Sequence, residues 1–273
     1  MIQARRGARC YATPQQVMKT RWRPLSPAWD ALGRANAFGA VLTRADGELG
    51  SWQCDEFFAT GVADAERFVA DLTALAPTVS RARVLDFGCG VGRVTHALAA
   101  YFGEAVGVDV AASMIERARA LDPERRCSFV LNHARDLTCF ESGAFTVVYS
   151  RLVLQHIRPA LVRRYVPELV RVLAPGGVLM FQLPDAIGVD PERGAPFVRR
   201  LKRLVPWSVV VGWRLLKCRL SGPTEVSQMT MFGLPAADVL ALIAGAGGRV
   251  LDVRADDSHG CDRVRGFEYW VTR

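Results

Sequence analysis

The segment from Val84 to Arg93 constrains the fold of this 273-residue chain more than any other part of it. A short apolar run leads directly into three glycines at alternate positions, Gly88, Gly90 and Gly92. Glycine has no Cβ, so a strand that runs into such a loop and then into a helix lets the backbone come close to a bound ligand. The segment therefore predicts a strand, a loop for a nucleotide-like ligand, and a helix.

From residue 82 onward, short β-branched or apolar runs alternate with amphipathic stretches, which is typical of a parallel sheet with helices on both faces. The expected strands span 82–87, 105–109, 127–132, 145–150, 177–183, 249–255 and 265–272. The expected helices span 61–76, 92–102, 112–121, 159–173 and 235–246. Pro159 suits a helix start, whereas Pro167 predicts a kink or a split within the same helix.

The domain organisation follows from composition along the chain. With 50% hydrophobic residues, the chain can bury one substantial core. Residues 1–60 form an N-terminal part, a basic arm and then an aromatic cap, and Met18 is an alternative start within the arm. Residues 61–273 form the main α/β domain. Inside that domain, about 191–223 fits the alternation poorly and is predicted to be a basic helical insertion.

Net charge and cysteine content limit the kinds of protein this chain can be, but they do not identify its binding partner. The net charge of +8 suits nucleic acid, anionic lipid or an acidic substrate. Every apolar run is too short to span a bilayer, and the N-terminus lacks the apolar stretch of a secretory signal. The seven cysteines are odd in number and form no Cys-x-x-Cys pair. This favours reduced thiols in the cytoplasm and predicts no metal site.

The acid that precedes the glycines indicates which nucleotide the loop binds. A dinucleotide-binding loop would read Gly-x-Gly-x-x-Gly and hold a pyrophosphate. Here Asp86 lies before alternating glycines, and its carboxylate would repel a pyrophosphate but suits a ligand with an ammonium and a sulfonium. S-adenosylmethionine has both groups. Asp109 ends the next expected strand, where an acid commonly pairs with ribose hydroxyls, in NAD enzymes as well.

Three segments together resemble the class I S-adenosylmethionine-dependent methyltransferases. Val84–Gly92 resembles motif I of that family, Gly107–Asp109 its ribose motif, and Arg171–Gly177 the turn that follows the later motifs. The resemblance covers about residues 60–185. It implies a Rossmann-like, doubly wound, seven-stranded sheet with an antiparallel last strand.

The same resemblance implies a set of cofactor-binding residues. Asp86 would hold the ammonium of the methionine moiety, and Asp109 the ribose. The other expected contacts are Gly88, Cys89, Gly90, Val110, Met114, His133, Ala134 and Ser150. His133 stands where the family usually has an acid, so the adenine contact is left open among Asn132, His133, Ala134 and Asp136. The structural alternatives are a turn for Asp86 and the glycines, and a strand-end cap for Asp109. For Cys89 the alternative is a small loop residue, and for Met114 ordinary helix core.

The acceptor side is expected after the fourth strand. Methyltransferases of amino groups on bases often have Asn or Asp followed by Pro-Pro and an aromatic there, whereas this chain has Ser150-Arg151-Leu152-Val153-Leu154-Gln155-His156-Ile157. That run resembles small-molecule and lipid methyltransferases. His156 is the first candidate for a base or for positioning the acceptor, with Gln155 beside it. Tyr149 and Asp185 are expected near the same pocket. Trp52, Phe57 and Phe58 are expected either over it or packed from the cap onto the core.

These observations predict a methyltransferase that acts on a small-molecule, glycan-like or lipid-like acceptor. An RNA or protein methyltransferase, and a non-catalytic cofactor-binding module, are the alternatives. The basic and apolar residues of 199–219 favour contact with anionic lipid or a lid over an amphiphilic substrate. The alternative is a helical flap packed by its own apolar face, with its Arg and Lys side chains in solvent. We therefore expect a cytoplasmic protein. Peripheral contact with an anionic membrane is a further prediction, and nucleic acid is a less favoured partner than a small-molecule or amphiphilic substrate.

Overall fold

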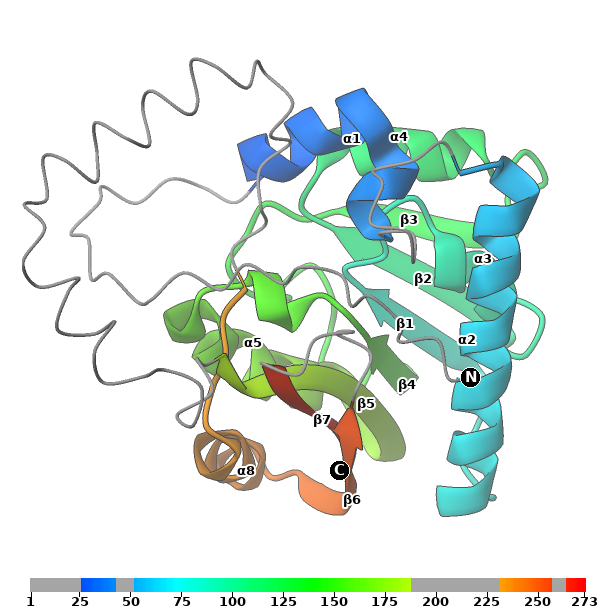
Figure 1. Cartoon of the computed structure of the whole chain (residues 1–273). Coiled ribbons are helices and arrows are strands. Elements are labelled where there is room, and N and C mark those ends of the chain that lie inside the picture. The colour runs from blue at the N-terminus through cyan, green and yellow to red at the C-terminus, as the bar shows by residue number, and fades with distance from the viewer. Residues whose placement is uncertain (1–25, 43–51, 188–230, 257–263) are drawn as a thin grey trace, which may run out of the picture.

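The computed structural model describes residues 26–42, 52–187, 231–256 and 264–273. Their strands form one seven-stranded sheet in the order β3-β2-β1-β4-β5-β7-β6 (Figure 1). The strands are β1 Arg83–Phe87, β2 Glu104–Asp109, β3 Cys127–Leu131, β4 Phe145–Ser150, β5 Leu173–Ile187, β6 Arg249–Asp256 and β7 Val264–Thr272. All neighbours among β1 to β5 pair in parallel, whereas β7 is antiparallel to both β5 and β6. The expected doubly wound sheet with an antiparallel last strand is confirmed.

Helices cover both faces of this sheet. They are α1 Ser26–Val41, α2 Cys54–Leu75, α3 Arg93–Leu98, α4 Ala112–Ala120, α5 Pro159–Val172, α8 Ala236–Gly245 and the short 3-10 helix η1 Leu154–His156. On one face, α2 and α3 pack on Val84, Val147 and Trp270. On the other, α5 and α8 pack on the alternate residues of the same strands, such as Leu85 and Val148. Figure 1 shows α2 standing along one side of the sheet and α8 on the opposite side.

Three helices differ from the sequence prediction. Helix α1 was not expected, because its segment was interpreted only as part of an aromatic cap. The helix expected from residue 61 begins at Cys54, because Asp55 and Glu56 favour its first turn and Phe57 buries completely against the core. Helix α5 runs unbroken through Pro167, so the predicted split does not occur. Its apolar face, which includes Val166 and Leu169, is fully buried on the sheet, and this packing offsets the backbone hydrogen bond that proline removes.

The aromatic part of the N-terminal region packs as a small core of its own. Helix α1 lies against α4, where a Cβ on Gly33 would stand 2.4 Å from Ser113 Oγ. Ser113 in turn donates from its backbone N–H to Asp30 at 2.7 Å. Phe57, Val91 and Met114 form the buried centre of this cluster. Helix α1 is thereby fixed beside the glycine loop.

No helix within the described ranges is long and apolar enough to cross a bilayer. The basic arm and the whole insertion at about 191–223 lie outside the described residues. Their predicted contact with anionic lipid or an amphiphilic substrate therefore stays a prediction.

Candidate cofactor and acceptor site

The glycine loop lies at the carboxyl end of β1. On one side of β1 the sheet continues with β2 and β3, and on the other side with β4 and β5, so the strand order reverses at β1. Ligands of open α/β sheets usually bind at such a point. Gly88, Gly90 and Gly92 all have left-handed backbone, with φ of 79°, 55° and 82°. A Cβ on Gly88 would come within 2.4 Å of the Val153 side chain. Glycine is thus required here by backbone conformation and by close packing.

Asp109, at the end of β2, ties this loop in place. Its Oδ2 accepts a hydrogen bond from the Gly90 backbone N–H at 2.9 Å, and its Oδ1 accepts one from the Ala111 N–H at 2.9 Å. Burial raises the pKa of Asp109, and the backbone N–H groups of Ala111 and Gly90 oppose that shift. Each carboxylate oxygen has a second lone pair that can accept from a ligand hydroxyl.

Asp86 is a buried carboxylate beside the same loop. Its side chain is only 4% exposed, and Oδ2 accepts a hydrogen bond from the Thr95 hydroxyl at 2.6 Å. Burial raises the pKa of Asp86 to about 6, although Thr95 and the Arg93 charge lower it. Within the described part of the chain no cationic side chain forms an ion pair with Asp86. A buried carboxylate in this state is stabilised by a ligand cation.

Thr95 was not singled out from sequence. It lies in the first turn of α3, and its hydroxyl reaches Asp86 only because α3 packs over the end of β1. Nothing in the local sequence distinguishes this threonine from any other helical one.

Four other residues expected around the cofactor are partly or fully buried: Cys89, Val110, Met114 and Ser150. The Cys89 thiol packs against Gly107, and burial raises the Cys89 pKa, which opposes a nucleophilic thiolate. Met114 is 2% exposed within the aromatic cluster. Ser150 donates from Oγ to the Phe87 carbonyl at 3.1 Å and so joins β4 to β1. Val110 is half-buried beside Asp109.

The loop after β3, expected near the adenine, is organised by Asn132. The Asn132 amide donates to the Asp136 carbonyl at 2.7 Å and accepts from the Ala134 N–H at 3.0 Å. The Ala134 carbonyl accepts from the Tyr165 hydroxyl at 2.9 Å. His133 is exposed at the tip of this loop. Which of these groups contacts the adenine stays a prediction.

The acceptor side lies in η1, directly after β4. Gln155 is buried, and its side-chain amide lies 3.1 Å from His156 Nε2. Trp29 of α1 contacts the His156 ring edge-on at 5.4 Å between centroids. Gln182 of β5, which is fully buried, donates from Nε2 to Gln155 Oε1 at 3.4 Å. Sequence reasoning missed Gln182, although one amide inside an otherwise apolar strand was a usable signal.

Tyr149 and Asp185, also expected near the acceptor, have other surroundings. Tyr149 points to the α2 face and packs edge-on against Phe68 at 4.9 Å between ring centroids. Asp185 accepts from the Ala236 N–H at 2.7 Å at the start of α8, and it forms an ion pair with Arg265. Partial burial raises the pKa of Asp185, but the Ala236 N–H and Arg265 outweigh this effect and hold the pKa below its usual value. Asp185 thus stabilises the start of α8.

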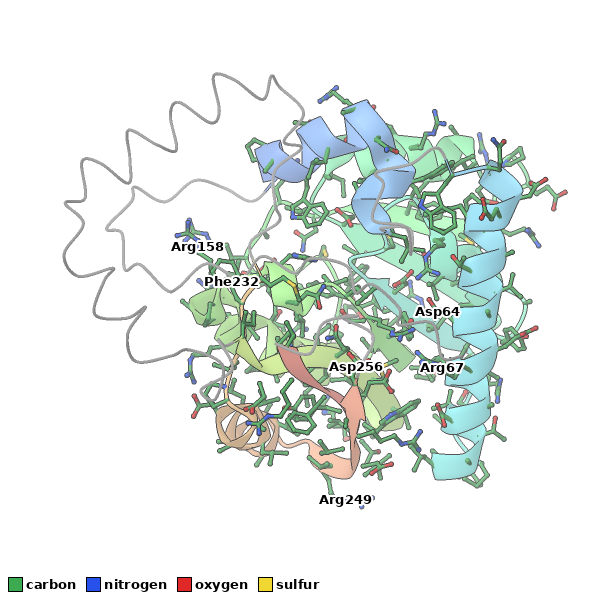
Figure 2. All side chains as sticks on the ribbon, in the orientation of Figure 1. Asp64, Arg67, Arg158, Phe232, Arg249 and Asp256 are labelled. Atoms are coloured by element: carbon green, nitrogen blue, oxygen red, sulfur yellow. The ribbon has the colours of Figure 1, made fainter. Side chains whose placement is uncertain are left out.

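A partly buried ionic cluster, also missed from sequence, joins α2 to the ends of the strands. Asp64 accepts from Arg93 at 2.7 Å and from Arg151 at 2.6 Å. Glu268 of β7 lies 3.5 Å from Arg67 and 3.8 Å from Arg151. Figure 2 shows Asp64 and Arg67 on α2 with Asp256 across from them at the end of β6. The cluster fixes α2 beside β4, because breaking a buried pair leaves an uncompensated charge.

One group in the described part of the chain brings metal-binding side chains together. The nearest ligand atoms of His96, Asp122 and Cys127 lie within 4.8 Å of one another. Both Asp122 oxygens already accept backbone N–H groups, from Arg126 and Cys127, and so cap the turn before β3. Burial raises the pKa of Cys127 to about 12, which opposes the thiolate that a metal needs. The turn itself explains this grouping.

Part of this chain is similar to known methyltransferases. Residues 85–181 match the family model described as a methyltransferase domain. A trans-aconitate 2-methyltransferase of Methylobacterium radiotolerans is 32% identical over 173 residues, which are 63% of this chain and 63% of that protein. A malonyl-[acyl-carrier protein] O-methyltransferase of Herminiimonas arsenicoxydans is 35% identical over 118 residues, 42% of each chain. The chain thus spans less than two thirds of the length of either relative.

The fold comparison agrees with the sequence comparison. The structure of a magnesium protoporphyrin IX methyltransferase from Synechocystis with bound SAH has a TM-score of 0.59 to this chain. The match covers 91% of this chain and 97% of that one at 15% identity. At such low identity the match establishes the shared fold alone.

Proposed function

We propose that this chain, which matches a methyltransferase domain over residues 85–181, transfers the methyl group of S-adenosylmethionine to a small-molecule acceptor. The cofactor supplies an activated methyl group on its sulfonium. The protein's contribution is to hold the donor, align the acceptor in line with the methyl carbon, and exclude water.

Asp86 is the observation that carries the proposal. Its carboxylate is buried at the mouth of the glycine loop with a hydroxyl partner and no described ion pair. The ammonium of the cofactor supplies the missing positive charge, which makes binding favourable at neutral pH. Gly88 and Gly90 keep side chains out of the cradle, and Asp109 offers its remaining lone pairs to the ribose hydroxyls.

The acceptor is proposed to bind beside η1. His156 lies at the carboxyl end of β4, on the same edge of the sheet as the glycine loop, and Trp29 covers its ring. Two relatives that match this chain are named for acceptors with carboxyl groups, trans-aconitate and a malonyl group on a carrier protein. We therefore propose a carboxylate oxygen as the methylated atom. The proposal also covers an amphiphilic acid, given the basic residues of 199–219.

Calorimetric titration with S-adenosylhomocysteine tests the donor half of the proposal. We expect binding by the wild-type chain, weakened binding by Asp86→Ala and Asp109→Ala, and wild-type binding by the control Asp55→Ala, whose side chain is exposed on α2. Unchanged affinity in both site variants would contradict the placement of the cofactor.

The acceptor half is tested with cofactor labelled in the methyl group. Small di- and tricarboxylic acids, their carrier-protein thioesters and fatty acids are offered in parallel with RNA and total protein. We expect base-labile label, as in a methyl ester, in an acid of this panel. Label in RNA or protein alone would replace the proposal with the macromolecular alternative.

A further inference from the structure

We propose that Gln155 and Gln182 are positioning residues that hold the proton of the neutral His156 imidazole on Nδ1, so that His156 does not act as a base on the acceptor. This inference rests on the proposed function for its catalytic meaning. The protonation state itself is a property of the free protein and can be tested separately.

The direction of the hydrogen bonds begins at a group that can only donate. The backbone N–H of Leu152 donates to Gln182 Oε1 at 3.1 Å. A backbone amide N–H has no lone pair to accept with, so this contact fixes which end of the Gln182 amide is the oxygen. The NH₂ end of Gln182 therefore points to Gln155, where it donates to Oε1 at 3.4 Å.

The same constraint passes to His156. With Gln155 Oε1 accepting from Gln182, the Gln155 NH₂ is the end that lies 3.1 Å from His156 Nε2. An amide NH₂ is a donor only, so His156 Nε2 must accept and cannot carry a proton. The proton of the neutral imidazole is then on Nδ1.

Burial and backbone geometry keep this network from rearranging. Gln182 is fully buried, and Gln155 is 6% exposed. The carbonyl of Gln155 accepts from the Phe232 N–H at 2.7 Å, which holds η1 to the segment before α8. Leu152 has a left-handed backbone, with φ of 61°, that is unfavourable for a leucine. Such strain persists where surrounding contacts demand it, and here it turns the Leu152 N–H towards Gln182.

The consequence for the reaction is a restriction on the acceptor. In this state His156 Nε2 is occupied and Nδ1 already holds its proton, so the ring has no free basic nitrogen. A base is needed only when the acceptor must lose a proton. A carboxylate oxygen is already anionic at neutral pH and needs no base. The network therefore favours carboxylates over alcohols or amines as acceptors.

The tautomer can be measured without an acceptor. Long-range proton–nitrogen NMR of the uniformly ¹⁵N-labelled full chain at mildly alkaline pH reports which nitrogen of each histidine is protonated. The signals of His156 are assigned by their loss in His156→Asn. We expect the proton on Nδ1 in the wild-type protein. A proton on Nε2 would overturn the inference whether or not the protein is a methyltransferase.

Two variants test the roles of the glutamines. Gln155→Glu has no NH₂, so its carboxylate accepts from Gln182 and draws a proton onto His156 Nε2; we expect the Nε2–H form. Gln182→Met removes the group that orients Gln155, and we expect both tautomers. An unchanged Nδ1–H state in a folded Gln155→Glu protein would overturn the mechanism. Exposed His133 serves as the internal control, because its tautomer equilibrium should not change in either variant.

Kinetics then connects the tautomer to catalysis once an acceptor is found. With saturating cofactor, we expect kcat not to rise with pH through the imidazole range. A rise that is lost in His156→Asn would show that His156 acts as a base.

Discussion

The two sides of the site are built differently. The donor wall, which we define as Asp86, the glycine loop and Asp109, is held mainly by backbone groups: the N–H groups of Gly88 and Cys89 bond to Val108, and Gly90 bonds to Asp109. The acceptor wall, defined as η1 with Gln182, is held by side-chain amides. The glycines that shape the donor wall are close together in the chain and next to Asp86, so the sequence itself shows them. The amide network joins Gln155 to Gln182, which are far apart in the chain. The donor-binding wall could therefore be predicted from the sequence, whereas the acceptor wall could not.

The largest effect is expected from Gly88→Ala. A Cβ there would lie 2.4 Å from Val153, with φ at 79°. We expect a loss of about 3 kcal/mol in the free energy of unfolding, since both steric overlap and left-handed strain are involved. Gly176→Ala is the matched control, with φ at 72° but no atom within 4 Å of its Cβ, and should lose only about 1 kcal/mol. Equal losses in urea denaturation would contradict the clash with Val153.

Asp86→Asn is expected to raise the free energy of unfolding at neutral and alkaline pH, by an amount comparable to the loss in Gly88→Ala. Because the native pKa is raised from 3.8 to about 6, the native state binds more protons than the unfolded state between these values. The buried Asp86 charge therefore lowers the free energy of unfolding by its full amount above about pH 6, and this loss disappears below about pH 4. The variant should be more stable than wild type at pH 8, by up to about 3 kcal/mol, and equal to it at pH 4. Denaturation at both pH values measures this.

The same group predicts how cofactor affinity depends on pH. The ammonium needs ionised Asp86, so the affinity for S-adenosylhomocysteine should fall about tenfold for each pH unit below about 6. Asp86→Asn should bind weakly with a flat profile. A wild-type profile without this fall would show that Asp86 does not contact the charged end of the cofactor.

Asp109→Ala should have an intermediate effect. The substitution removes two hydrogen bonds within the loop and the expected ribose contacts, and we expect affinity for the cofactor to fall by about 2 kcal/mol, or about thirtyfold. Asp109→Asn retains one acceptor oxygen and should lose less. If both variants bound equally well in calorimetry, the loop would not depend on the second oxygen.

The smallest effect is expected on the acceptor side of α1. Trp29→Leu removes the edge-on contact with His156, and such aromatic pairs contribute about 1 kcal/mol. We expect affinity for S-adenosylhomocysteine to change less than about twofold, because the donor wall keeps its backbone bonds. A large loss of affinity would show that the two walls are coupled through α1.

The strands and most helices were predictable from the sequence, because apolar periodicity records which face of each element is buried. Cys54 as the start of α2 was not, since the segment before residue 61 reads as an aromatic cap and only its packing around Phe57 reveals a helix. The interior Pro167 was misleading for a related reason. Tertiary packing of α5 outweighs the local cost of a proline.

Local sequence was enough to define the sheet, the glycine loop and the two acids that point to S-adenosylmethionine. Each of these depends on residues close together in the chain, such as Asp86 beside Gly88. The partners of the site residues were set only by the packing of distant elements: Thr95 on Asp86, Asp64 between Arg93 and Arg151, and Gln182 behind Gln155. A hydrogen bond between elements distant in sequence leaves no periodic pattern along the chain. The donor is therefore encoded locally, whereas the state of His156 is set by the fold.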